Sequence, residues 1–213
     1  MEVLQLAPGL WRWTARHPGW TPAEDWEPEV GCVYWEAADA VVLVDPLVPP
    51  DEGERFWRAL DGDVERLGRP VRVLLTCAWH ARSAAEVAAR YGGELLLPDV
   101  GETAVTGARR LRPGEALPGG AVAVPATPAC EEVVYWLPGV RAAVPGDTIL
   151  GDGAGGVRLC PAAWLRDGQT RADLATALRP LVALGVERLL VSHGQPVLAE
   201  AAAALERALA EAA

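Results

Sequence analysis

The most constraining feature of the chain is a short apolar run that ends in polar side chains directly before an amphipathic segment. Residues 71–75 (VRVLL) are aliphatic and partly β-branched, which predicts a buried strand. Ser83 and Glu86 have the spacing of a capping box, which predicts a helix from Ser83 to Tyr91. Because α/β sheets place binding loops at the carboxyl ends of strands, the loop between the two elements is a candidate functional site. The alternative is an ordinary strand-to-helix turn.

Strand and helix patterns alternate along the rest of the chain, which predicts an α/β fold. Before the loop, the patterns predict a strand at residues 10–14, a hairpin of residues 31–35 and 40–44, and a helix at residues 51–67. After it, we expect a strand at 94–97, a connection with two weak strands at 99–120, strands at 121–124, 133–137 and 141–144, a glycine-rich loop at 151–156, a helix from 170 to 185, a strand at 188–191 and a helix at 197–212. No linker divides the chain, so residues 1–213 are predicted to form a single domain.

Composition excludes several classes of function. The formal net charge of −10 disfavours nucleic acid and anionic membranes as partners, because both attract basic surfaces. All 19 basic residues are arginine, so catalysis by a lysine is excluded. The longest apolar runs are shorter than the ~20 residues that a membrane helix needs, and the start has no basic segment typical of a secretory signal. We therefore expect a cytoplasmic protein with a small-molecule ligand or substrate; nothing here indicates the oligomeric state.

Cysteine and tryptophan usage adds weaker indications. The four cysteines are far apart without a C-x-x-C pair, which favours free thiols or individual metal ligands over a disulfide framework. Tryptophans are concentrated in the first 35 residues, and we expect them to pack in the core or against loops rather than to line a substrate entrance. His17, in a Pro-Gly turn, is expected to be ordinary surface.

Four short motifs resemble those of the metallo-β-lactamase superfamily and follow in the same order. Residues 75–82 (LTCAWHAR) align without gaps with the family signature L-T-H-x-H-x-D-H. Residues 127–130 (TPAC) resemble T-P-G-H, residues 145–148 (PGDT) resemble P-G-D-T, and residues 191–194 (VSHG) resemble the terminal G-H-G. The early VVLVDP also resembles a strand end of the family. The resemblance covers nearly the whole chain and implies an α/β fold of the four-layer αββα sandwich type, with a metal site along one edge.

The resemblance implies that most of the family's metal ligands are replaced. The three histidines that hold the first metal in the family correspond to Cys77, Trp79 and Cys130. The aspartate that bridges both metals corresponds to Asp147. Since an indole cannot bind the metal, the family's first site is not retained in its usual form.

The second metal site of the family is altered as well. The signature's aspartate, its last histidine and the terminal histidine correspond to Ala81, Arg82 and His193. Arg82 is permanently protonated and has no lone pair to offer a metal. A standard two-metal site is therefore excluded.

A single zinc site remains a hypothesis. Zinc accepts thiolate, imidazole and carboxylate ligands, so Cys77, Cys130 and Asp147 supply three candidate ligands. His193 is then a fourth ligand or a general acid or base. In the alternative, Cys77 and Cys130 are small buried residues that fill the space of the lost histidines, and no metal is bound.

Arg82 and His80 carry two further hypotheses. The charge of Arg82 replaces the second metal by pairing with Asp147, or Arg82 simply faces solvent. His80 occupies a variable slot of the gapless alignment. A slip of one or two residues would bring it beside Asp147 and His193 for metal binding or acid/base chemistry; otherwise it is a polar turn residue.

Together these residues predict a divergent hydrolase-like protein with at most one metal, acting on a small ester, thioester or amide. The candidate catalytic residues are Asp147, His193, His80 and Arg82. The alternative is a metal-free, inactive pseudoenzyme that serves as a binding or interaction protein. A serine hydrolase is disfavoured because the chain has no G-x-S-x-G motif.

Overall fold

A computed structural model describes residues 1–100, 104–112, 115–126, 131–166 and 168–212. Its larger sheet has seven strands, which lie side by side in chain order. The strands are β1 (Glu2–Ala7), β2 (Leu10–Arg16), β3 (Glu29–Glu36), β4 (Val41–Val44), β5 (Val71–Leu74), β6 (Glu94–Leu97) and β7 (Ala108–Arg110). The first four strands pair antiparallel, whereas β4 to β7 pair parallel.

The second half of the chain forms a smaller sheet in the order β13-β10-β9-β8 and a separate two-stranded hairpin. The sheet consists of β8 (Val122–Pro125), β9 (Val133–Leu137), β10 (Ala142–Val144) and β13 (Arg188–Leu189), and the hairpin of β11 (Ile149–Gly151) and β12 (Val157–Leu159). Short 3₁₀ turns occur at η1 (Ala78–His80), η2 (Pro118–Gly120), η3 (Pro138–Val140) and η4 (Ala162–Trp164).

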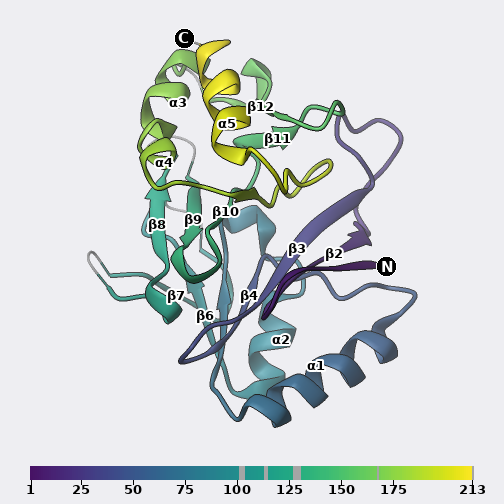
Figure 1. The fold of residues 1–213 in the computed structure, drawn as a ribbon. Helices are drawn as coiled ribbons and strands as arrows, with labels where there is room; N and C mark the ends of the chain where they lie inside the picture. The colour runs from purple at the N-terminus through teal and green to yellow at the C-terminus, as the bar shows by residue number, and fades with distance from the viewer. Residues whose placement is uncertain (101–103, 113–114, 127–130, 167, 213) are drawn as a thin grey trace.

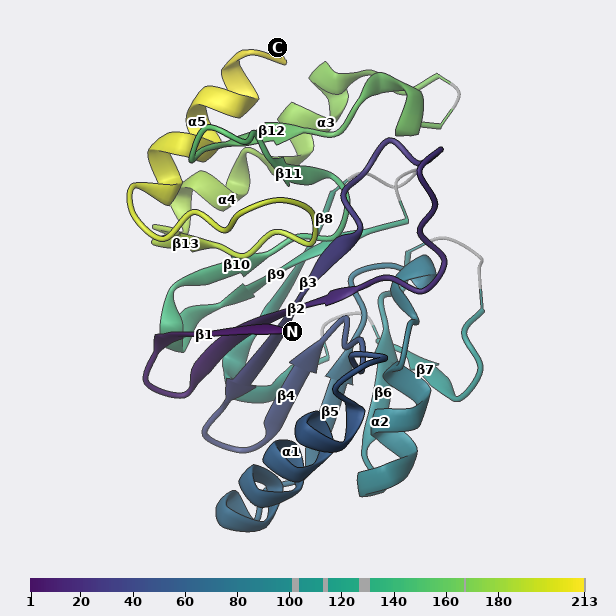
Figure 2. The same cartoon turned by 90° about the vertical axis from the view of Figure 1, so that its right-hand side faces the viewer.

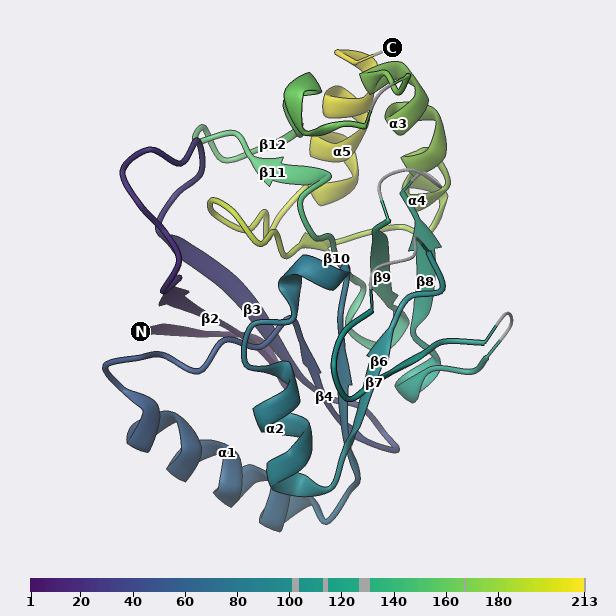
Figure 3. The same ribbon diagram turned by 180° about the vertical axis from the view of Figure 1, so that it is seen from behind.

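Helices cover the outer faces of both sheets, so the molecule has four layers (Figures 1, 2 and 3). Helices α1 (Gly53–Leu67) and α2 (Ala84–Tyr91) pack on the larger sheet, and α3 (Arg171–Leu178), α4 (Pro180–Ala183) and α5 (Ala201–Ala210) lie over the smaller one. None of the described helices is long and apolar enough to cross a membrane. The αββα sandwich predicted from the sequence is confirmed.

Strand β9 illustrates how an apolar sequence places a strand between two layers of the fold. Its five residues are all buried, and successive side chains of a strand point to opposite faces. Tyr135 packs in the cluster between the two sheets, whereas Val134 and Trp136 pack in the cluster that includes the helices α3 and α5. A strand covered on both faces reads as a continuous apolar run, as VVYWL does.

Several local predictions were wrong. Ser83 does not cap α2; its hydroxyl accepts a hydrogen bond from the Val48 amide at 3.0 Å instead. The strand β1 was not predicted, and the glycine-rich loop at 151–156 joins the unpredicted strands β11 and β12. Strands β11 and β12 have only three residues each, which carry too little periodicity to be recognised. In contrast, the helix predicted from residue 170 begins as expected, because Thr170 and Asp173 form a capping box at the start of α3.

The hydroxyl of Tyr135 provides a test of the packing between the sheets. It is completely buried and donates to the carbonyl of Leu75 at 2.9 Å, which links β9 to the end of β5. We expect Tyr135→Phe to lower the free energy of unfolding by about 1–2 kcal/mol, because the buried carbonyl loses its partner. Urea denaturation measures this loss. Tyr34→Phe is the control, since the Tyr34 hydroxyl makes only a 3.5 Å contact with Glu36; equal losses in both variants would contradict the assignment.

Candidate metal centre

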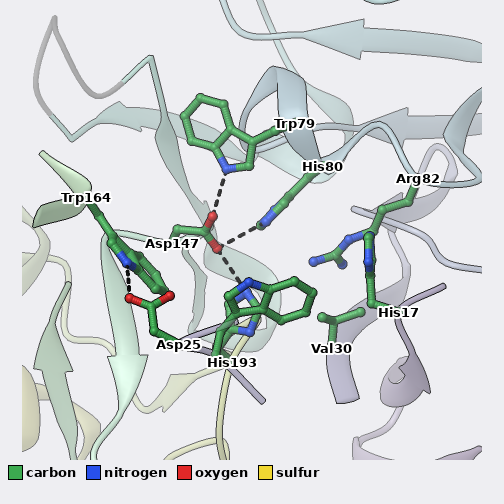
Figure 4. Close-up of a pocket in the computed structure, with 10 residues that line it drawn as sticks. His17, Asp25, Val30, Trp79, His80, Arg82, Asp147, Trp164 and His193 are labelled. Carbon is green, nitrogen blue, oxygen red and sulfur yellow. Dashed lines mark hydrogen bonds and ion pairs between the residues drawn. The ribbon is translucent and has the colours of Figure 1, made fainter. Parts of the chain in front are cut away.

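Three loops, which follow β5, β10 and β13, bring together the two histidines and the aspartate of a candidate metal centre (Figure 4). His80 ends the 3₁₀ turn η1, Asp147 lies between β10 and β11, and His193 follows the last strand. His80 and His193 are buried, whereas the side chain of Asp147 is 20% exposed. All three residues line a cavity of about 290 Å³ that is open to solvent.

Both imidazoles direct Nε2 toward the same oxygen of Asp147. The distance to Oδ1 is 3.1 Å from His80 and 3.3 Å from His193, and one ligand atom of each residue lies within 4.8 Å of the other two. The second oxygen, Oδ2, accepts a hydrogen bond from Trp79 Nε1 at 2.7 Å. This leaves Oδ1 as the oxygen that faces both histidines.

The contacts at Oδ1 fit metal ligation better than hydrogen bonding. Although both nitrogens are close, neither has hydrogen-bond geometry, and within the described part of the chain the buried Oδ1 has no hydrogen-bond partner. Ligand atoms around a tetrahedral zinc, at about 2.0–2.1 Å from the ion, lie about 3.3 Å apart. The observed separations from Asp147 are close to this value, so the donor set fits a zinc ion.

His80 is oriented by polar groups behind it. Its Nδ1 lies 2.8 Å from Asp45 Oδ2 and 3.1 Å from the Thr76 hydroxyl, while Thr76 in turn donates its amide to Asp45 at 2.8 Å. A carboxylate at Nδ1 holds the proton there and leaves Nε2 to face the cavity, an arrangement common behind metal-binding histidines.

His80 and Asp147 each favour the charged form of the other. Burial lowers the pKa of His80, but Cys77, Asp147 and Asp45 outweigh it and raise the pKa well above its ordinary value. Because burial also raises the pKa of the Cys77 thiol to about 12, the two carboxylates are the charges that act near neutral pH. Burial would raise the pKa of Asp147, yet His80 and His193 lower it well below the usual range.

Glu132 holds the loop that carries Asp147. Its buried carboxylate accepts hydrogen bonds from the amides of Gly146, Asp147 and Thr148 at 2.8–3.2 Å, and from the Thr148 hydroxyl. Burial, followed by the negative charge of Asp147, raises the pKa of Glu132 to about 7. Gly146 is required in this loop, because a Cβ would lie 2.7 Å from the Thr76 hydroxyl and 2.8 Å from the Glu132 carboxyl carbon.

The proposed pairing of Arg82 with Asp147 was wrong. The Arg82 guanidinium donates to the carbonyls of Gly31 and Asp45 at 3.2 and 3.0 Å, and to the Ser192 hydroxyl at 2.8 Å. A positive φ of 35° at Arg82 accompanies this turn toward β3 and the loop after β13. Arg82 still lines the cavity, where it holds the residue preceding His193.

Arg12 holds the same loop from the other side. This arginine is 3% exposed and donates to the carbonyls of Val191 and Gly194 at 3.2 and 2.9 Å. The backbone of Gly31 also donates to the Ser192 carbonyl at 2.7 Å. The position of His193 therefore depends on contacts to residues on both sides of it in the chain.

The two cysteines predicted as ligands are not part of this cluster. Cys77 is completely buried and lies outside the group formed by His80, Asp147 and His193, and Cys130 is outside the described residues. With a pKa of about 12, Cys77 is a neutral thiol near pH 7 and is not suited to act as a nucleophile.

The walls of the cavity contain residues that sequence reasoning did not assign to a site. They come from the segment between β2 and β3 and from η4, and they include His17, Asp25, Trp26 and Trp164. Trp13 and Trp35 are buried in the core, as expected. Trp26 and His17 were expected to be packing and surface residues; their role in the cavity carries no signal in the local sequence.

Removal of the Glu132 charge tests how the loop is held. Glu132→Gln places an amide NH₂ against backbone donors, so we expect the free energy of unfolding to fall by about 2–3 kcal/mol, as for hydrogen bonds to a buried charged group. Denaturant titration measures the change. Glu187→Gln serves as the control, because Glu187 is 53% exposed and its ion pair with Arg141 is at the surface; it should lose less than about 1 kcal/mol. A similar small loss for Glu132→Gln would show that the loop does not depend on this carboxylate.

Among the comparisons with known proteins, the one with solved structures shows the fold. No family model matches the chain, and no curated protein matches its sequence. Among solved structures, a metallo-β-lactamase from Erythrobacter litoralis is 19% identical with a TM-score of 0.64, over 99% of this chain and 91% of that one. A metallo-β-lactamase from Pontibacter korlensis is 15% identical with a TM-score of 0.69, over 98% of each chain.

A third solved structure, a metallo-β-lactamase family protein from Thermus thermophilus, is 19% identical with a TM-score of 0.60. The match covers 97% of this chain and 80% of that one. Since the likeness extends over nearly all the chain at low identity, it concerns the fold and not the activity. The chain thus has the metallo-β-lactamase fold, with a divergent sequence.

Proposed function

We propose that the protein is a single-metal hydrolase that acts on a small ester, thioester or amide. The observation that supports this most directly is the convergence of two imidazole Nε2 atoms on one carboxylate oxygen of Asp147, beside an open cavity. Three protein ligands with one position left open is the arrangement of catalytic zinc sites. Because solved structures of the same fold include metallo-β-lactamases, an amide is a reasonable substrate class to test.

His80, Asp147 and His193 would hold the metal. This set differs from the ligands predicted from the motifs, because His80 takes the place assigned to the two cysteines. Nitrogen and carboxylate ligands suit zinc, and two histidines with one carboxylate also suit Fe(II), so the metal is to be determined by competition. When bound, zinc supplies a Lewis acid that polarises a carbonyl and lowers the pKa of a water.

The surrounding residues prepare the site for this chemistry. Asp45 lies 2.8 Å from Nδ1 of His80 and would keep a proton there, while Nε2 faces the cavity. Trp79 donates to Asp147 Oδ2, which fixes the carboxylate with Oδ1 toward both histidines. Because these partners are held by the folded chain, little reorganisation is needed when a ligand enters.

Metal analysis of the purified protein tests this proposal. We expect about one zinc per chain, and at least about 100-fold weaker zinc binding for His80→Ala and His193→Ala, since each removes one of three ligands. The measurement is a zinc titration against a competing chelator after removal of metal. His17→Ala is the matched control, because it removes the chain's only other histidine, which lines the cavity outside the cluster.

Hydrolysis is measured on the same variants with chromogenic ester, thioester and β-lactam substrates. Activity should require added zinc and should be lost in His80→Ala and His193→Ala. Zinc binding that is equally strong in the wild type and both variants would contradict the assigned ligands. A folded protein that binds no metal would contradict the hydrolase proposal.

A metal-free binding protein is the second candidate, and one observation favours it. His80 lies between two carboxylates, with Nδ1 2.8 Å from Asp45 and Nε2 3.1 Å from Asp147. A protonated imidazole in this position would form ion pairs on both sides and stabilise the cluster without a metal. The zinc titration separates the two candidates.

A further inference from the structure

Three tryptophans line the cavity around the candidate metal centre. Trp26, Trp79 and Trp164 come from the segment before β3, from η1 and from η4. The rings of Trp26 and Trp164 lie 5.1 and 6.4 Å from the ring of His193, and Trp79 is bonded to Asp147. Trp79 is 49% exposed, although burial of an indole is favourable. An exposed indole at the entrance of a cavity indicates a surface for a ligand.

Each of these indoles donates its N–H to a carboxylate. Trp26 donates to Glu24 at 3.1 Å, Trp79 to Asp147 at 2.7 Å and Trp164 to Asp25 at 2.8 Å. In contrast, Trp13 and Trp20, outside the cavity, donate to backbone carbonyls. Hydrogen bonding to a negative charge polarises the donor, which adds electron density to the ring. An electron-rich indole face attracts a cation.

The charged residues that line the cavity lie on two sides of it (Figure 4). Asp25 and Trp164 lie on one side of Asp147, whereas Arg82 and His17 lie on the other. The Arg82 guanidinium is already bonded to two backbone carbonyls and the Ser192 hydroxyl. Arg166, near Trp164, is paired with Glu131 at 2.6 Å. The Trp164 side of the cavity is therefore lined by indole rings and a carboxylate.

We propose that the substrate carries a cationic alkylammonium group, which binds among Trp26, Trp79 and Trp164 beside Asp25. The proposal rests on the proposed function, because the scissile carbonyl would then lie toward His80 and His193. Cation–π attraction from the indoles and the carboxylate of Asp25 both favour a positive charge here. The cavity is open to solvent, which suits a substrate whose charged end remains near solvent.

A pair of probes with the same shape and different charge tests the proposal. Choline carries a trimethylammonium group, and 3,3-dimethyl-1-butanol is its neutral analogue. The side-chain N–H signals of ¹⁵N-labelled protein report binding at individual tryptophans. We expect choline to bind at least about threefold more tightly than the neutral alcohol, the lower end of a cation–π contribution, and to shift the signals of Trp79 and Trp164.

Two variants and a control connect the preference to the named residues. Trp164→Leu removes an aromatic face, and Asp25→Asn removes a charge while keeping the size of the side chain; each should remove most of the preference for choline. Trp57→Leu is the control, because Trp57 lies on α1 and packs against Phe56, Tyr91 and Arg90 outside the cavity. It should leave the preference unchanged. Asp25→Asn keeps the test valid if Trp164→Leu disturbs the fold.

Equal affinity for the two probes, or a preference that survives both variants, would overturn the proposal. Because the titration is performed without substrate turnover, on protein with and without added zinc, its outcome is separate from that of the metal analysis. Zinc binding without a preference for choline would reject the cationic substrate alone. A preference for choline without zinc binding would retain the cation site and reject the hydrolase.

Discussion

Three consecutive backbone amides, of Gly146, Asp147 and Thr148, point at the buried carboxylate of Glu132. A buried carboxylate without partners is costly, so the loop and the glutamate stabilise each other. This arrangement fixes the backbone of Asp147 from behind and leaves its side chain to face His80 and His193. The candidate metal centre therefore depends on a carboxylate that is not itself a ligand.

The two histidines are positioned in different ways, His80 through its ring and His193 through the residues beside it in the chain. Asp45 and Thr76 contact Nδ1 of His80, while Arg12 and Arg82 bond to the chain on either side of His193. The loops after β5 and β13 are thus tied to the early strands of the larger sheet. Positions fixed in this way allow three side chains from distant segments to converge within a few ångströms.

The sequence predicted the layers better than the site. Continuous apolar runs such as β9 and the capping box at Thr170 depend on neighbouring residues, so local patterns were sufficient. The orientation of His80 depends on the 3₁₀ turn η1, in which the alternation of an extended strand does not apply. The roles of Glu132 and Trp164 arise only from tertiary contacts with residues far away in the chain, and no motif carries that information.

The ligand replacements are consistent with one another. Trp79, in the place of a histidine of the resembled signature, bonds to Asp147 Oδ2, the oxygen that does not face the histidine pair. The carboxylate oxygen that faces away from the histidines needs a hydrogen-bond partner, and the indole N–H of Trp79 supplies it. Arg82, in the place of another histidine, supplies hydrogen bonds to Ser192 and to two backbone carbonyls. At both positions hydrogen bonds hold the loops, and these loops place the candidate ligands His80, Asp147 and His193 together.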